Sequence, residues 1–188
     1  MAKVAAGRKT RARAASLGAL FGDSAVAREA AGVLLLGVVA IAALGLWSFD
    51  AHDAVFRWVA VKNAGGVAGA SLAGLLVRFA GVAAWGIVLA VGAIAAQLLT
   101  AGRLVVPRQF WIAAGVSFLA VAALPALLAT LRPDRFVTLS GGWLGGSLAG
   151  LESALLSAYG AFVLNALLLA VGIAGFFGVP AGEALAAL

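Results

Sequence analysis

The sequence contains no cysteine, a single histidine and few charged residues. Without cysteine, the chain has no disulfide framework, no thiolate metal site and no redox motif. His52 alone cannot build a metal site, because protein metal sites need several ligands. Charged residues make up 11% of the 188 residues, whereas soluble domains carry about a quarter. We therefore expect no metal, no cofactor and no soluble globular fold.

The sequence also lacks the residue patterns of common catalytic sites. No G-x-x-x-x-G-K-[ST] segment occurs, so no loop of backbone amides followed by a lysine is present to hold a nucleoside triphosphate. Sites with a serine or cysteine nucleophile fail similarly, because His52 is isolated and cysteine is absent. We predict that this chain is not an enzyme by itself. An ATP-driven motor would have to lie on another region or on a separate chain.

Long apolar runs dominate the chain instead. Hydrophobic residues make up 64% of the sequence, and four runs are long enough to cross a bilayer core, which takes about 20 residues. In hydrocarbon, backbone amides must be paired within their own segment, so runs of this length predict helices. The predicted fold class is an all-α integral membrane protein whose membrane domain covers 30–179. Its four transmembrane helices are expected at about 30–49, 79–99, 110–131 and 155–179.

Basic residues are distributed unevenly between the segments outside these runs. The tail 1–29 carries many of them, and the connector between the second and third runs carries Arg103 and Arg108 without an acid. Since positive charge marks the cytoplasmic side, we predict that both termini are cytoplasmic, with 180–188 as a C-terminal end or the start of a linker. The basic cluster 3–13 has no interleaved aromatics, so membrane lipid is the expected partner and no direct nucleic-acid binding is expected.

Two glycine-rich segments, 63–75 and 140–151, match at eight positions without a gap. Each follows an outward-going run and precedes an inward-going one. The chain is therefore predicted to contain two parallel helix–glycine motif–helix repeats, unlike the inverted repeats of many transporters. The matched pairs are Gly65 with Gly141, Gly66 with Gly142, Gly69 with Gly145, Ser71 with Ser147, Leu72 with Leu148, Ala73 with Ala149, Gly74 with Gly150, and Leu75 with Leu151.

The glycine segments are predicted to turn the chain and to pack helices. Both glycine pairs, Gly65–Gly66 and Gly141–Gly142, are expected to adopt the positive φ that turns the chain back toward the membrane. Residues 68–99 are too long for one upright span, so each motif should form a separate helical turn or a steeply tilted extension. Small residues four apart allow close helix contact in lipid, which is predicted for Gly65 with Gly69, Gly142 with Gly146, and Gly146 with Gly150.

Two polar side chains, Gln97 and Asn165, fall inside predicted spans. An asparagine there commonly makes an interhelical hydrogen bond of about 0.6–2 kcal/mol. Because intramembrane polar residues also mark transport paths, a small multi-pass transport or channel subunit remains the alternative, with Arg78 as a third polar residue. Arg78 lies at the predicted outer boundary, where its guanidinium can reach the headgroups. Gln97 lies near the inner boundary, so both positions favour structural roles.

The segment after the first run carries an ordered series of motifs. Ser48, Phe49 and Asp53 form S-[FY]-x-x-x-D, and N-x-G-G-x-x-G-A-x-L-A and G-x-x-A-aromatic follow. With the second motif GGWLGGSLAGL, this series resembles the N-terminal four-helix membrane domain of FtsK/SpoIIIE-type DNA translocases, over about Arg28 to Val179. The matching residues are Asn63, Gly65, Gly66, Gly69, Ala70, Leu72, Ala73, Gly81, Ala84 and Trp85, and in the second motif Gly141, Gly142, Gly145, Gly146 and Gly150.

This resemblance implies a membrane anchor and assembly domain of a septal DNA translocase that acts in cell division and chromosome segregation. It further implies a place in the bacterial inner membrane at the division septum, a homo-oligomer, and contacts with other cell-division membrane proteins. The chain departs from the family at Ala51 and Ala54, where prolines are usual, and at Gly74, where an acidic residue often follows L-A. These departures bear on the role of the first outer connector.

Overall fold

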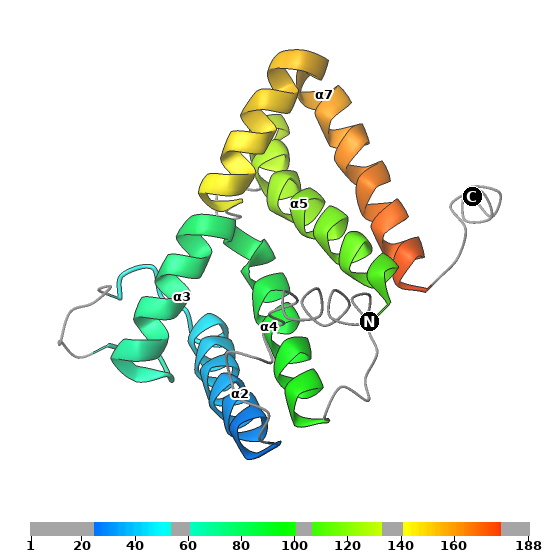
Figure 1. The fold of residues 1–188 in the computed structure, drawn as a ribbon. Coiled ribbons are helices and arrows are strands. Elements are labelled where there is room, and N and C mark those ends of the chain that lie inside the picture. The colour runs from blue at the N-terminus through cyan, green and yellow to red at the C-terminus, as the bar shows by residue number, and fades with distance from the viewer. Residues whose placement is uncertain (1–24, 54–60, 101–106, 133–140, 178–188) are drawn as a thin grey trace, which may run out of the picture.

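Figure 1 shows a computed structural model, which describes residues 25–53, 61–100, 107–132 and 141–177. In these ranges all regular elements are helical: α2 (Ala25–Trp47), α3 (Gly66–Ala80), the single 3₁₀ turn η2 (Gly81–Ala83), α4 (Ala84–Leu99), α5 (Arg108–Leu131) and α7 (Gly142–Phe176). Four stretches are long and apolar enough to cross a membrane: Ala25–Trp47, Gly66–Leu99, Arg108–Leu131 and Gly142–Phe176. The predicted all-α fold with four membrane spans is confirmed.

The helix bounds differ from the predicted spans mainly where a glycine motif enters. The first and third helices lie close to the expected 30–49 and 110–131, and α5 continues through Pro125. The second and fourth spans are preceded by a further helical segment, because both glycine motifs are themselves helical. The tail 1–24, the end 178–188 and the connectors 54–60, 101–106 and 133–140 lie outside the described residues.

The chain folds as two similar units, one made of α2, α3 and α4 and the other of α5 and α7. In each unit a long helix is followed by a 15-residue glycine helix, which we define as α3 (66–80) in the first unit and residues 142–156 of α7 in the second. The glycine helix ends at a sharp bend, and a return helix then runs back. Figure 1 shows both bends, one between α3 and α4 and the other within α7.

The bends occur at corresponding residues of the two units. Gly66 and Gly142, which open the glycine helices, have φ of 64° and 66°. Gly81 and Ser157 then follow at the same interval, with φ of 59° and 63°. A break recurring at matched positions supports the predicted parallel repeat at the level of backbone conformation.

Small side chains allow these helices to approach closely. In the first unit, Gly32 of α2 faces Leu99 of α4; in the second, Gly172 of α7 faces Ser117 of α5. Three buried alanines, Ala80, Ala83 and Ala122, lie where the two units meet. Since apolar burial does not drive helix association in lipid, such close contact between small residues is the expected source of stability.

Candidate assembly site in the glycine helices

Asn63 holds the start of α3 against the end of α2. Its side chain is 5% exposed, and its amide nitrogen donates to the carbonyl oxygens of Gly45 at 2.8 Å and Ser48 at 3.3 Å. Its amide oxygen accepts from the backbone N–H of Gly65 at 2.9 Å, while its own carbonyl accepts from the N–H of Gly66 at 2.9 Å. One asparagine thus provides hydrogen-bond partners for backbone groups at the ends of both helices, which explains why an asparagine precedes the glycine pair in the N-x-G-G segment.

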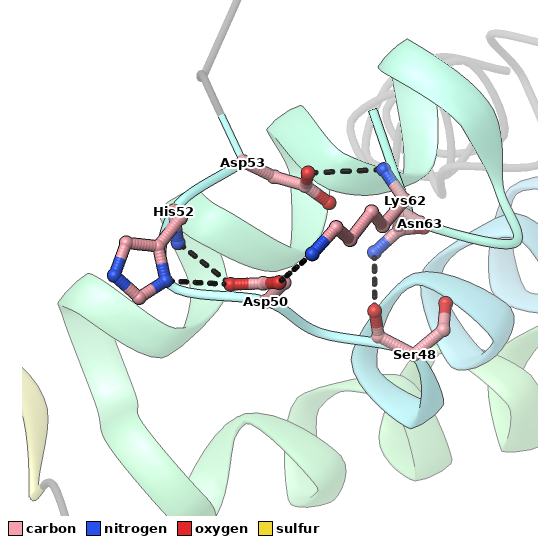
Figure 2. A network of polar contacts seen from close by, with 6 residues as sticks. All are labelled: Ser48, Asp50, His52, Asp53, Lys62 and Asn63. Atoms are coloured by element: carbon pink, nitrogen blue, oxygen red, sulfur yellow. Dashed lines mark hydrogen bonds and ion pairs between the residues drawn. The ribbon is translucent and has the colours of Figure 1, made fainter. Parts of the chain in front are cut away.

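A small polar network organises the loop between these helices (Figure 2). The Asp50 carboxylate accepts from the backbone N–H of His52 at 2.9 Å, lies 3.0 Å from its Nδ1, and is 4.0 Å from the Lys62 ammonium. The N–H and the ring of His52 lower the pKa of Asp50 below its usual value. Asp53 accepts from the backbone N–H of Lys62 at 3.0 Å. Ser48 and Asp53 of the motif therefore shape this loop.

Sequence reasoning missed the part that Asp50 plays in this loop. A signal was present, because aspartate commonly hydrogen-bonds the backbone two residues further on. His52 is exposed, and its ring is paired with the Asp50 carboxylate. Ser48 adds a further connection across the loop, since its hydroxyl accepts from the N–H of Ala64 at 2.8 Å and donates to the carbonyl of Leu44 at 2.7 Å.

In the first unit, α2 and α3 cross at glycines. A Cβ placed on Gly45 would lie 2.5 Å from the carbonyl oxygen of Gly69, and one on Gly69 would lie 2.8 Å from the Asn63 side-chain oxygen. At Gly65 a Cβ would lie 2.8 Å from the Gly69 Cα. Of the other predicted motif residues, Ala70 and Ala73 are buried, and Leu72 packs against the core of this unit.

The second unit has the same kind of crossing, between α5 and the glycine helix of α7. A Cβ on Gly141 would lie 2.5 Å from the carbonyl oxygen of Ala122. A Cβ on Gly145 would lie 2.6 Å from the carbonyl carbon of the same Ala122 and closer still to its oxygen. Nothing lies within 4 Å of a Cβ on Gly146 or Gly150. Close contact at Gly146 and Gly150 stays a prediction, and it would have to involve a surface outside these described residues.

Only the second glycine of each pair has a positive φ. Gly65 and Gly141 have φ of −82° and −79°, so the expectation of positive φ is wrong for them. The reason is that they form a turn leading into the helix, and the left-handed residue comes one position later. At Gly142 space is restricted as well, because a Cβ would lie 2.5 Å from the backbone nitrogen of Gly81.

Asn165 connects the two arms of α7. It is 1% exposed, and its amide nitrogen donates to the Glu152 carboxylate across the bend and to the Ala161 carbonyl at 2.9 Å. Glu152 precedes the predicted span 155–179 in the sequence, but it lies within the glycine helix of α7. Asn165 thus gives this half-buried carboxylate a hydrogen-bond donor. Gln97 lies half-buried near the end of α4.

These features define a class of protein: a four-span helical membrane domain built from two units, each organised around a glycine helix. The chain belongs to the family described as the 4TM region of DNA translocase FtsK/SpoIIIE, whose model matches residues 24–188. This family region is a membrane anchor and not the ATPase motor. No curated protein and no solved structure matches the chain.

Proposed function

We propose that this chain is the membrane anchor and assembly domain of a septal DNA translocase that acts in cell division and chromosome segregation. The observation that carries the proposal is the family match over residues 24–188, on a fold with four membrane-spanning helices. In this role the domain holds a cytoplasmic ATP-driven motor at the bacterial inner membrane. The motor is carried by another region or a separate chain, and this domain contributes no reaction of its own.

The proposed orientation places both termini in the cytoplasm. Its support is the distribution of charge, because the basic residues of the tail and of the connector between α4 and α5 favour the cytoplasmic side. These residues are Lys3, Arg8, Lys9, Arg11, Arg13, Arg28, Arg103 and Arg108. The loop containing Asp50 and the connector 133–140 then lie on the outer side of the membrane.

We propose three kinds of partner: membrane lipid, further copies of this chain, and other membrane proteins of cell division. Large apolar side chains such as Val33, Leu34 and Val163 are exposed on the helix surfaces, as contact with lipid or with another helix requires. Gly146 and Gly150 are exposed on α7, and their lack of side chains allows another helix to approach closely. No nucleic-acid contact is proposed for this chain.

The transport alternative is supported less well by the positions of the polar residues. A cavity of about 720 Å³ lies between α4 and α5, and its lining contains no charged and no amide side chain. Arg78, Gln97 and Asn165 are not among its lining residues, and Asn165 is already bonded to two acceptors. A path for a polar solute would need polar groups along its wall, so the anchor is the better proposal.

A fluorescent protein fused after Leu188 tests the anchor role in dividing cells. Because no motor is attached, septal fluorescence would have to come from contacts of the membrane domain itself. The expected result is enrichment at the division site, with immunoblotting to establish that the fusion is full length. Uniform fluorescence over the whole membrane would contradict the septal role and favour the transport alternative.

A further inference from the structure

The two units contact each other within the chain through unlike surfaces. The bend of the first unit packs against the start of the second glycine helix. The rings of Phe79 and Trp143 stack with centroids 6.2 Å apart, and the bend fits against Gly142, where a Cβ would lie 2.7 Å from the Phe79 carbonyl oxygen. Ala80 and Ala83 are buried in the same contact, with Leu144 packed against them.

The parallel repeat means that each unit carries both surfaces, and one of each is left uncovered. At the bend of the second unit, Leu155, Leu156 and Tyr159 correspond to Phe79, Ala80 and Ala83. These three side chains are 75%, 49% and 74% exposed.

The start of the first glycine helix is uncovered as well. Gly66 and Ala68 correspond to Gly142 and Leu144, and both are exposed. Among the described residues, a Cβ on Gly66 would meet nothing within 4 Å, whereas a Cβ on Gly142 would meet the bend of the first unit. The backbone of both surfaces therefore recurs on the same molecule, with larger side chains at the second bend, where Leu156 and Tyr159 stand in place of Ala80 and Ala83.

We propose that a second copy of this chain repeats the internal contact. The bend of α7 in one copy, formed by Leu155, Leu156 and Tyr159, docks on the start of α3 in the next copy, around Gly66 and Val67. Leu155 takes the place that Phe79 has inside the chain, and Val67 takes the place of Trp143. The inference rests on the proposed self-association and names the surface responsible for it.

Three properties of the chain favour a second copy as the occupant. The contact continues an interface that the fold already contains, both surfaces are apolar, and parallel units keep every copy in the same orientation in the membrane. Because the two surfaces differ, the contact is heterologous, and repeating it produces a ring when the rotation closes. A two-fold dimer through a single shared patch is a different arrangement and is excluded by this proposal.

Cysteine cross-linking in native membranes tests the contact, since the natural chain has no cysteine. The full chain carrying Leu155→Cys and Val67→Cys should give a ladder of multimers with a short bifunctional thiol reagent. Chains with only one of the two substitutions should stay single when expressed alone and give dimers when co-expressed. The matched control, Val33→Cys with Val163→Cys, places both thiols on other exposed apolar surfaces, which are 60% and 55% exposed, and should give no ladder.

The internal contact supplies a positive control, because Phe79→Cys with Trp143→Cys should cross-link within one chain. If this pair reacts and the Leu155–Val67 pair gives no multimers, the proposed contact is overturned. Equal multimer yield from either single variant alone would also overturn it, because that result indicates a two-fold dimer. Light scattering of the wild-type chain in lipid nanodiscs separates the two proposals: a monomer refutes self-association itself, whereas an oligomer without the cross-link refutes only this surface.

Discussion

Replacing Gly145 with alanine adds one methyl group where α5 and α7 cross. The new Cβ would lie 2.6 Å from the carbonyl carbon of Ala122 and closer to its oxygen, whereas ordinary contacts begin near 3.4 Å. The obstructing atoms are backbone, so they cannot rotate away as a side chain can. The two helices would have to separate by about 1 Å or more, and the packing of Ala123 and Ala149 in the same core would loosen.

Overpacking of this kind costs about 1–3 kcal/mol and occasionally more. The backbone contact places Gly145→Ala at the upper end, with an expected loss of about 3 kcal/mol. The neighbouring Gly146→Ala is the matched control, because no described residue of the same chain lies within 4 Å of its Cβ. Alanine also favours the helix over glycine by about 1 kcal/mol, so the control should be neutral or slightly more stable.

Thermal melts of both variants in mixed detergent micelles, followed by circular dichroism, measure this difference in stability. Gly145→Ala should melt well below the parent, and Gly146→Ala should melt at or above it. Equal stability of the two variants would refute the reasoning, because the adjacent positions differ chiefly in whether a neighbouring helix touches them.

Three further predictions concern the first loop and the bend of α7. Asn63→Asp keeps the shape of the side chain but replaces the donor to the Gly45 carbonyl with an acceptor, so detergent melts should show a loss of about 2–4 kcal/mol. Ser157 has a backbone conformation that essentially only glycine adopts easily, so Ser157→Gly should raise stability by about 1 kcal/mol and Ser157→Val should lower it; the reverse order would contradict the strain. The pKa of Asp50 is lowered, so its contribution to the loop is present above its unfolded pKa of about 4 and is lost as the pH falls through the folded value. A fluorescent probe on the loop should therefore report opening only as the pH falls below about 4, and Asp50→Asn should remove that step.

The membrane spans could be predicted because apolar length alone determines them. Backbone amides cannot remain unpaired in lipid, so an uncharged run of this length must be helical. The helices predicted at 30–49 and 110–131 are therefore found in the structure, with modest errors at their ends. The glycine helices were anticipated from the repeat, since chain length between Ala68 and Leu99 exceeded what one upright span needs. Their lengths were not anticipated, because glycine has low helix propensity and packing in lipid overrides that preference.

The bend at Ser157 and the half-buried position of Glu152 could not be predicted from local sequence. Serine rarely adopts a positive φ, and its hydroxyl lies 3.5 Å from the Gly160 N–H, a long contact at the start of the return helix that becomes visible only in three dimensions. A lone acid beside a span normally indicates the end of that span. Here Asn165, on the other arm of α7, supplies a hydrogen-bond donor to the half-buried Glu152 carboxylate. Pairings between distant residues of this kind require the tertiary fold.

Thiol labelling of single-cysteine variants tests most directly whether the two units lie parallel in the membrane, on which the anchor role and the contact between copies both depend. Ala51→Cys and Asp134→Cys place one thiol in each proposed outer segment, and Gly7→Cys places one in the tail. In intact cells an impermeant reagent should label positions 51 and 134 and should reach position 7 only after lysis. Labelling at position 7 without labelling at 51 would overturn the proposed orientation, and labelling at only one of the two outer positions would contradict the parallel arrangement.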